Sequence, residues 1–371
     1  MSARAAAKWI PGVALLGLFV AIPYLSVGTG GTFSGPLDSP GTLQLLALML
    51  VFGGVAMSYD LLFGYTGLLS FGHALYFAVG VYLVAIATTR WGWEFSQAVL
   101  LAAAVGLVLP IVLGTICLRV GGIAFAMVTL AFAEAGAILV RGNPHSWTGA
   151  DEGTSVAYEK LPASFVGVFN TVNLYWVALG FAVAVILICT WAVDSSPGRV
   201  WQAIRENELR VEVLGLRPVT FKLMVFTLGS FLATLGGVVY VLLIGTASPD
   251  TASPNLTLTL LIMVVLGGAG TRWGAFLGGM LYTFADKRLP TLAGSDFVQS
   301  LPSFLSTPLS EPLFVLGVLF ILIVYFVPGG IAGLITRSPR VGLAALEGVV
   351  SREKPAEPMA EPAAEQTEVE A

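Results

Sequence analysis

Ser70 and His73 are the residues best placed for nucleophilic catalysis, and they follow Gly67 in the stretch Gly-Leu-Leu-Ser-Phe-Gly-His. A nucleophile elbow needs a glycine two residues on each side of its serine, and Leu68 occupies one of these positions. The glycine–lysine pair of a phosphate-binding P-loop is missing too, because the lysines follow Ala, Glu, Phe, Asp and Glu. The sequence therefore argues against a serine hydrolase and a P-loop ATPase. If ATP drives this chain, another subunit must hydrolyse it, and no cofactor is expected here.

The composition indicates a membrane protein, because 56% of the 371 residues are hydrophobic and only 11% are charged, whereas soluble domains carry about 25% charged residues. We predict an all-α, polytopic protein with about 8–10 transmembrane helices, some of them short or glycine-interrupted. The candidate spans are residues 9–27, 42–59, 65–89, 97–118, 120–140, 173–193, 221–244, 256–270, 274–288 and 312–331. Cys117 and Cys189 both fall in apolar runs, so neither a disulfide framework nor a metal site is predicted.

Ionisable residues inside these apolar runs are few. Asp60 and Asp286 stand near the ends of runs, and His73 and Glu134 lie deeper. A charge in hydrocarbon is costly and usually marks function, so Glu134 is a candidate for contact with a transported solute. The alternative, which the residue type favours, is that Glu134 joins two helices by hydrogen bonds and that His73 satisfies a buried partner. So few carboxylates are unusual for a proton-coupled carrier.

Two glycine-rich stretches, Gly64–His73 and Leu266–Gly274, interrupt the spans, one in each half of the chain. Irregular backbone is tolerated at membrane depth only where protein or a water-filled cavity satisfies its polar groups. Such interruptions often mark a substrate path, but close packing of helices through small residues explains the same glycines equally well. The candidates for a translocation path are Tyr65, Thr66, Ser70, His73, Thr129, Glu134, Gly267 and Gly268.

The distribution of positive charge predicts the topology. With both termini inside, the cytoplasmic segments hold 13 of the 18 basic residues, including all five between Arg199 and Lys222. The net charge of −4 belongs to the C-terminal end, which carries seven glutamates after Val341. We expect three regions: an N-terminal helix with an outer loop at 1–41, a membrane domain at 42–333, and a disordered acidic cytoplasmic tail at 334–371. The first apolar run resembles a signal peptide but is expected to remain as an uncleaved span.

The segment 194–222 is the most charged internal loop and is predicted to be cytoplasmic. Its charged residues are Asp194, Arg199, Arg205, Glu206, Glu208, Arg210, Glu212, Arg217 and Lys222. Ser196 is expected to cap a helix whose first residue is Pro197. Gly215 is expected to close this helix, and Pro218 to prevent it from resuming.

The predicted helix of this segment is amphipathic. One face carries Val200, Ile204, Val211 and Leu214, with Trp201 at its edge. Gln202, Leu209 and Val213 lie on the opposite face, among the charges. We expect the first face to rest on the membrane-embedded part of the chain, and the Leu209–Val213 pair to contact a second protein. An ordinary amphipathic connector is the alternative.

Four stretches together resemble a known family. They are YDLLFGYTGLLSFGHA (59–74), AMVTLAFAEA (126–135), AIRENELRVEVLG (203–215) and SPD followed by LLIMVVLGGAGTRWGAFLGG (248–279). In this order they resemble the LivM-type permeases of branched-chain amino acid ABC importers, over residues 42 to 333. The resemblance implies a cytoplasmic (inner) membrane protein with a second, related permease subunit, two cytoplasmic ATPase subunits and an extracytoplasmic solute-binding protein. ATP would be bound by the partner subunits.

By the same resemblance, residues 203–215 look like the segment that meets the ATPase. The candidate coupling residues are Arg205, Glu206, Glu208, Leu209, Arg210, Glu212, Val213 and Gly215. Similar permeases carry urea, short-chain amides and other amino acids, so the resemblance leaves the solute open. A stand-alone secondary transporter or channel is the main alternative, and an intramembrane enzyme is a weaker one. The partners expected besides protein are lipids, and no nucleic acid is expected.

Overall fold

The structure is a computed structural model that describes residues 17–26, 28, 35–167, 170–293, 311–327 and 329–335. The internal contacts separate residues 1–333 from residues 334–371. Residues 9–16 of the predicted first span and nearly all of the predicted tail lie outside the described residues.

The prediction of an all-α fold is confirmed. The main helices are α3 (Pro40–Asp60), α4 (His73–Thr89), α5 (Phe95–Cys117), α6 (Gly122–Arg141), α7 (Thr171–Asp194), α10 (Pro218–Ile244), α11 (Pro254–Gly267), α12 (Gly274–Ala293), α15 (Pro312–Phe326) and α16 (Gly330–Ile335). Short turns of helix are η1 (Ile22–Tyr24), η2 (Leu61–Tyr65), η3 (Pro144–Ser146), η4 (Ala150–Glu152), η5 (Tyr158–Lys160), η6 (Ala163–Phe165) and η8 (Pro249–Ala252). Two-residue strands β1 (Thr154–Ser155) and β2 (Thr246–Ala247) pair antiparallel. Among the described residues, five helices are long and apolar enough to cross a membrane.

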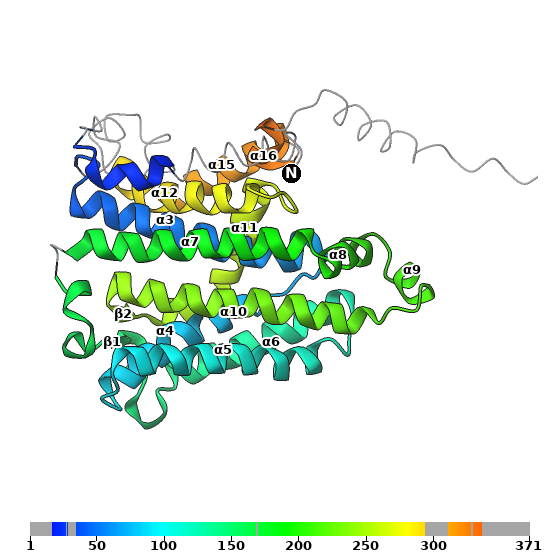
Figure 1. Cartoon of the computed structure of the whole chain (residues 1–371), viewed down its shortest axis with the longest axis horizontal. Coiled ribbons are helices and arrows are strands. Elements are labelled where there is room, and N and C mark those ends of the chain that lie inside the picture. Colours follow the sequence, from blue (N-terminus) through cyan, green and yellow to red (C-terminus); the bar gives the residue numbers. More distant parts are fainter. Residues whose placement is uncertain are drawn as a thin grey trace, which may run out of the picture. The chain divides into compact units, whose positions relative to one another are not determined.

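Helix α3 lies among the helices of residues 35–293 (Figure 1). Of its most apolar 18-residue stretch, 94% is buried. Helices α7, α10, α11 and α12 pack against it, and α10 also packs against α4 and α5. Of the most apolar 18-residue stretches of α5 and α6, only 22% and 33% are buried. Their outer surface carries exposed apolar side chains such as Leu100, Val108 and Ile138. In water such a surface would be unstable, so α5 and α6 face lipid or another membrane protein.

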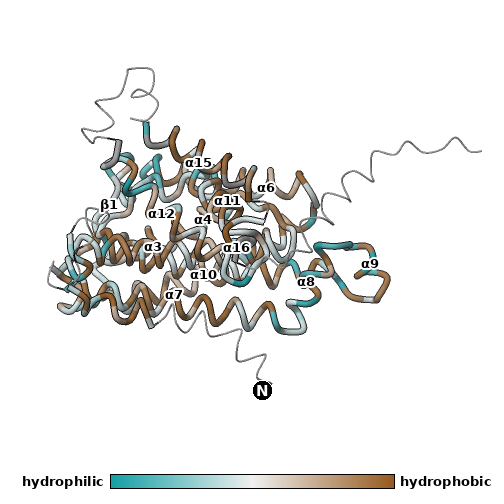
Figure 2. The backbone as a smooth tube through the Cα atoms, turned by 90° about the horizontal axis from the view of Figure 1, so that it is seen from above, coloured by the Kyte–Doolittle hydropathy of each residue, from teal (hydrophilic) through white to brown (hydrophobic). Residues whose placement is uncertain are grey.

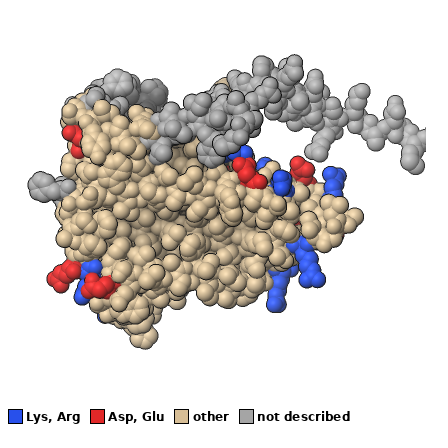
Figure 3. All heavy atoms as spheres, in the orientation of Figure 1, with Lys and Arg blue, Asp and Glu red and all other residues tan. Residues whose placement is uncertain are grey.

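The charged side chains lie toward two ends of the helices. Figure 3 shows Lys, Arg, Asp and Glu at the two ends of the visible face and an uncharged surface between them. Seen from above, most of α3 and α7 is apolar and the region around α8 (Ser196–Glu206) is more hydrophilic (Figure 2). An uncharged belt between charged ends is the pattern of a membrane-spanning protein. We refer to the end with α8 and α9 (Glu208–Val213) as the α8–α9 end and to the other as the β1–β2 end.

The predicted span 65–89 is not one helix. Helix α3 continues as a π-helical turn at Leu61–Tyr65, residues 66–72 are not helical, and α4 begins only at His73. The backbone of 66–72 finds its partners elsewhere, since the Tyr59 hydroxyl donates to the Ser70 carbonyl at 3.0 Å and the Phe71 N–H donates to Thr129 Oγ1 at 3.0 Å. The spans predicted at 256–270 and 274–288 become α11 and α12, with α11 as short as expected.

The charged segment forms two helices where one was predicted: α8 (Ser196–Glu206) and α9 (Glu208–Val213). Asn207 between them is extended, and its side chain caps α9 by accepting from the Arg210 N–H at 3.0 Å. The prediction that Ser196 caps the first helix was wrong, because Ser195 does so by accepting from the Gly198 N–H at 3.3 Å. Gly215 ends the segment with φ of 82°, which glycine adopts without strain.

One residue of the segment departs from its predicted face. Trp201, Ile204 and Val211 are buried as expected for the inner face. Leu214 was predicted on the same face, but it is 75% exposed. Leu209, Val211 and Val213 keep their predicted faces, and Leu214 departs from its own because it lies past the end of α9, at the C-cap position. Pro218 is the first residue of α10, so it starts the next helix as well as preventing α9 from resuming.

Candidate functional site

The two half-length helices α4 and α11 meet at their N-termini. The Ala74 N–H, in the first turn of α4, donates to Thr257 Oγ1 in the first turn of α11 at 2.9 Å. Both residues are fully buried. Thr129 on α6 is buried beside them, and its hydroxyl donates to the Ala126 carbonyl at 2.9 Å while accepting from Phe71. The sequence placed the two interruptions far apart, and the fold brings the helices they border together in the core.

Most of the predicted path residues are occupied in holding this interrupted backbone. His73 is fully buried, with Nε2 3.0 Å from Ser58 Oγ. Thr66 donates to the Leu61 carbonyl at 2.9 Å, and Ser70 Oγ accepts from the Gly72 N–H at 3.2 Å. A buried polar group without a partner is costly, and these contacts remove most of that cost within the chain. His73 Nδ1 is the exception, since it is buried and has no hydrogen-bond partner among the described residues. The arrangement holds α4 in register, and these side chains are turned into the protein.

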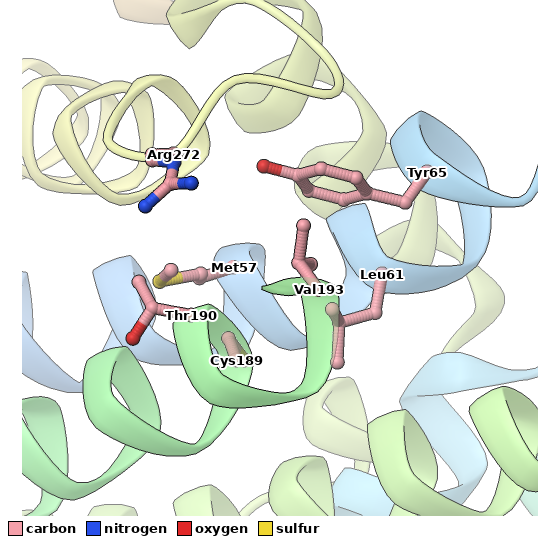
Figure 4. Close-up of a pocket in the computed structure, with 7 residues that line it drawn as sticks. All are labelled: Met57, Leu61, Tyr65, Cys189, Thr190, Val193 and Arg272. Carbon is pink, nitrogen blue, oxygen red and sulfur yellow. The ribbon is translucent and has the colours of Figure 1, made fainter. Parts of the chain in front are cut away.

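Tyr65 lies apart from these residues, at the α8–α9 end. It lines a pocket of about 10 Å³ together with Met57, Leu61, Cys189, Thr190, Val193 and Arg272. Figure 4 shows the Tyr65 hydroxyl and the Arg272 guanidinium on facing sides of this pocket. Arg272 also pairs with Asp194 at the end of α7, at 2.6 Å. The pocket has room for about one water molecule, so it is too small to hold an amino acid.

Glu134 lies beside an open groove of about 530 Å³ on the outer surface of α6 and α11. The groove is lined by Met127, Leu130, Ala131, Glu134 and Arg141 of α6, and by Ser253, Pro254 and Asn255 where α11 begins. The Glu134 side chain is exposed and has no hydrogen-bond partner within the described part of the chain. Within the described residues, Glu134 therefore does not join two helices by hydrogen bonds, which was the alternative interpretation. Opposite charges and an amide along one groove can bind a polar solute or a polar segment of a partner.

Gly267 and Gly268 lie away from this groove, at the α8–α9 end. Gly267 approaches the backbone of Gly274 at the start of α12, and Gly268 faces the Gly329 carbonyl. Gly268 has φ of 109°, which non-glycine residues rarely adopt. The packing explanation of these two glycines is therefore sufficient for their presence.

The predicted coupling residues divide into two groups. Leu209 and Val213 are 71% and 87% exposed, and the exposed charged residues beside them are Glu206, Arg210 and Glu212. By contrast, the guanidinium of Arg205 donates to the Gly64 carbonyl. Glu208 pairs with Lys222 at 2.5 Å. Arg205 and Glu208 thus fasten the segment to the rest of the chain, while Leu209 and Val213 are available to another protein.

Sequence reasoning missed two residues that lie near Arg205. Asp60 is only 1% exposed, and its Oδ1 accepts from the Gly270 N–H at 2.9 Å. Asp60 had been noted as an ionisable residue near a span end and Gly270 as part of a glycine-rich stretch. Nothing in the spacing of Asp60, Arg205 and Gly270 shows that they meet. The groove residues Arg141, Ser253 and Asn255 were missed for the same reason.

Comparison with known proteins shows the family to which this chain belongs. The family described as "Branched-chain amino acid transport system / permease component" matches residues 41–335, which include every helix from α5 to α15. The chain belongs to this family. Its members named below are transport permeases, so the family fits the belt of apolar helices and the multi-pass location in the inner membrane.

Relatives of known name extend this result. The chain is 27% identical over 290 residues to the high-affinity branched-chain amino acid transport system permease protein LivM of Escherichia coli (strain K12), covering 72% of this chain and 65% of that protein. It is 26% identical to a probable LivM of Methanocaldococcus jannaschii, covering 78% and 94%. It is 30% identical to the autoinducer 2 import system permease protein LsrC of Enterobacter sp. (strain 638), covering 78% and 81%. No solved structure matches the chain.

Proposed function

We propose that this chain is the transmembrane permease subunit of an ATP-driven importer that carries branched-chain or related amino acids across the cytoplasmic membrane. The observation that carries the proposal is the family match over residues 41–335. The chain itself performs no catalysis and needs no cofactor, and ATP is bound and hydrolysed by partner subunits. The missing P-loop and elbow spacings in the sequence support this division of labour.

The α8–α9 segment is the proposed contact with one of two cytoplasmic ATPase subunits. Leu209 and Val213 are exposed side chains on a charged segment. In water such side chains gain nothing, but in a groove on a partner each removes apolar area from solvent. The charged neighbours Glu206, Arg210 and Glu212 supply a polar rim that fixes the orientation of the contact.

A second permease subunit is the proposed neighbour of α6 and α11. The Glu134 groove opens on their outer surface, where a charged side chain would otherwise meet lipid at considerable cost. A second chain against this groove would enclose a polar path between the two subunits, and an extracytoplasmic binding protein would deliver the solute to it. Of the residues predicted to line the path, Glu134 is therefore the one we assign to it.

The solute is the part of the proposal that most needs a test. The relatives named LivM support a branched-chain amino acid, and the relative named LsrC imports autoinducer 2. Proteoliposomes that contain this chain with its partner subunits should be tested for ATP-dependent uptake of leucine, valine, urea, acetamide and autoinducer 2. Uptake of leucine or valine above the others supports the proposal. ATP-dependent uptake of only a different solute replaces the substrate, and uptake without ATPase subunits would indicate a channel or secondary transporter.

The orientation of the chain is tested separately. We propose that both termini and the α8–α9 segment are cytoplasmic, which rests on the 13 basic residues of the inner segments. Gln202→Cys, in a chain lacking Cys117 and Cys189, places a thiol on the exposed side of α8. An impermeant maleimide should label it in inverted vesicles and not in intact cells. Labelling in intact cells would reverse the topology.

A further inference from the structure

Arg205 connects the proposed docking segment to the two interrupted parts of the membrane domain. Its guanidinium leaves α8 and donates to the Gly64 carbonyl, inside the π-helical turn that ends α3. A side chain on Gly270 would meet Arg205 Nη1 at 2.8 Å, so the α11–α12 loop lies against the same guanidinium. Arg205 Cγ also lies 3.3 Å from where a Cβ on Gly67 would stand. One side chain of α8 thus touches the backbone of both glycine-rich stretches.

Asp60, the last residue of α3, lies beside this contact. It is 1% exposed, its Oδ1 accepts from the Gly270 N–H at 2.9 Å, and its Oδ2 has no hydrogen-bond partner among the described residues. Asp60 also lies against Gly64, where an added Cβ would collide with Asp60 Oδ1, and Gly64 carries the carbonyl that Arg205 contacts. A buried carboxylate with an unused oxygen is costly, so the nearby guanidinium offsets part of that cost. We call Asp60, Gly64, Arg205 and Gly270 the Arg205 cluster.

A second hydrogen bond from α8, made by Trp201, goes to a regular helix. Trp201 Nε1 donates to the Phe221 carbonyl of α10 at 2.9 Å, and α10 is an unbroken helix of 27 residues. The π-turn at 61–65, the nonhelical residues 66–72 and the loop 268–273 lack regular α-helical hydrogen bonding. Segments of this kind change conformation at a lower free-energy cost than a regular helix. Arg205 therefore contacts the parts of the membrane domain whose backbone is not a regular α-helix.

These segments border the two half-length helices. Residues 66–72 lead directly into α4, and the loop that contains Gly270 joins α11 to α12. α4 and α11 meet through Ala74 and Thr257, and the Glu134 groove begins at the start of α11. A displacement of Arg205 would pass to both half-helices at once, because each is held by backbone that the Arg205 cluster contacts.

We propose that Arg205 is a positioning residue that transmits movement of α8 to the glycine-rich stretches, and is not part of the surface that binds the ATPase. The inference rests on the proposed function, because it needs an ATPase that moves α8. It differs from docking in a measurable way. Loss of the Leu209–Val213 contact removes the ATPase, whereas loss of Arg205 leaves the ATPase bound but disconnects it from the membrane domain.

The test uses the complete complex, with Cys117 and Cys189 replaced and a reporter thiol at Leu69→Cys in the nonhelical stretch. The rate of maleimide labelling is measured without nucleotide and after trapping with ADP and vanadate, so no transported solute is needed. In the parent complex we expect trapping to change the rate at least about fivefold, within the usual range of coupling between sites. In Arg205→Met the ATPase should stay bound and the change should fall below about twofold.

Arg199→Met is the matched control, since Arg199 is on the same helix and its side chain contacts Ser196 within the described part of the chain. It should keep the parent's response. Arg205→Met leaves Asp60 buried without a nearby cation and can reduce assembly, so the Asp60→Asn/Arg205→Met double variant is measured too. We expect it to assemble and still lack the response.

Four results would overturn the inference. The first is that trapping changes the labelling rate of Arg205→Met as much as that of the parent complex. The second is loss of the ATPase from Arg205→Met as complete as from the Leu209/Val213 variant, which would make Arg205 a docking residue. The third is a double variant that cannot assemble, which would leave Arg205 with a folding role alone. An assembled parent complex without any change at Leu69 would also overturn it, whereas a parent that never retains the ATPase would contradict the proposed function.

Discussion

Helices α8 and α9 are two halves of one charged segment, yet the chain uses them in opposite ways. In α8, Trp201 and Ile204 are 3% and 6% exposed, and Arg205, although an exposed residue, donates to the Gly64 carbonyl. In α9, only Val211 is buried, while Leu209 and Val213 are 71% and 87% exposed. The first helix is fastened to the membrane domain and the second presents apolar side chains to solvent. Similar composition therefore says little about role, and attachment to the core says a great deal.

Asn207 makes this division possible. It is extended, with φ of −163°, so α8 ends there and α9 begins as a separate helix that the Asn207 side chain caps. Val211 still lies on the buried face, but α9 ends at Val213, and Leu214 beyond it is 75% exposed. With Val211 as its one buried residue, α9 rests on the core less extensively than α8 does.

The largest effect is expected from Ile204→Asp. The change buries an unpaired charge where α8 rests on the core, which costs at least about 3 kcal/mol. We expect a strong fall in the amount of monodisperse permease extracted from the membrane. Gln202→Asp, on the exposed side of the same helix, is the control and should leave the yield near the parent's. Equal yields for both would mean that α8 is not anchored through this face.

Leu209→Asp with Val213→Asp should have the next largest effect, on ATPase binding and not on yield. Burial of one leucine contributes about 1.5–3 kcal/mol, so the pair should lower ATPase affinity by at least about tenfold. The measurement is copurification of the ATPase and its stimulated hydrolysis at equal amounts of permease. A double variant that retains full binding and transport would show that the docking surface lies elsewhere.

A smaller effect is expected from Asn207→Ala. The change removes the side chain that accepts from the Arg210 N–H, and loss of such a cap costs about 1 kcal/mol. Alanine also permits α8 and α9 to join into one helix, which would shift Leu209 and Val213 from their present positions relative to the core. We expect ATPase affinity to fall about fivefold with normal yield. Asn207→Asp retains the cap and should bind the ATPase as the parent does. Parental ATPase affinity in Asn207→Ala would show that docking does not need the break between α8 and α9.

The smallest effect is expected from Lys222→Met, which removes the ion pair with Glu208. The Lys222 side chain is 12% exposed and that of Glu208 is 43% exposed, so the pair is worth up to about 1 kcal/mol. The melting temperature of the permease should fall by less than about 4 °C. Lys160→Met is the control, because Lys160 and Glu94 are 36% and 63% exposed and should contribute nothing measurable. Equal losses at both pairs would argue that α9 gains no special hold from Lys222.

The sequence by itself determined the class of the protein and the location of its exceptional segments. Apolar runs separated by charges can only form membrane-crossing helices, because backbone groups in lipid must be satisfied within a helix. The two glycine-rich stretches and the charged segment were found from composition alone. Exposure of Leu209 and Val213 also followed from the pattern, since both lie among charged neighbours on the same local face.

Only the tertiary structure decided how these segments meet. The Ala74–Thr257 and Asp60–Gly270 hydrogen bonds join residues separated by 183 and 210 positions. No local propensity or period carries information over that distance. The helix break at Asn207 and the contact of Arg205 with the Gly64 carbonyl were missed for a related reason. Arg205 stays exposed, as expected for an arginine in a charged segment. Only the fold brings the Gly64 carbonyl, 141 positions away, to its guanidinium.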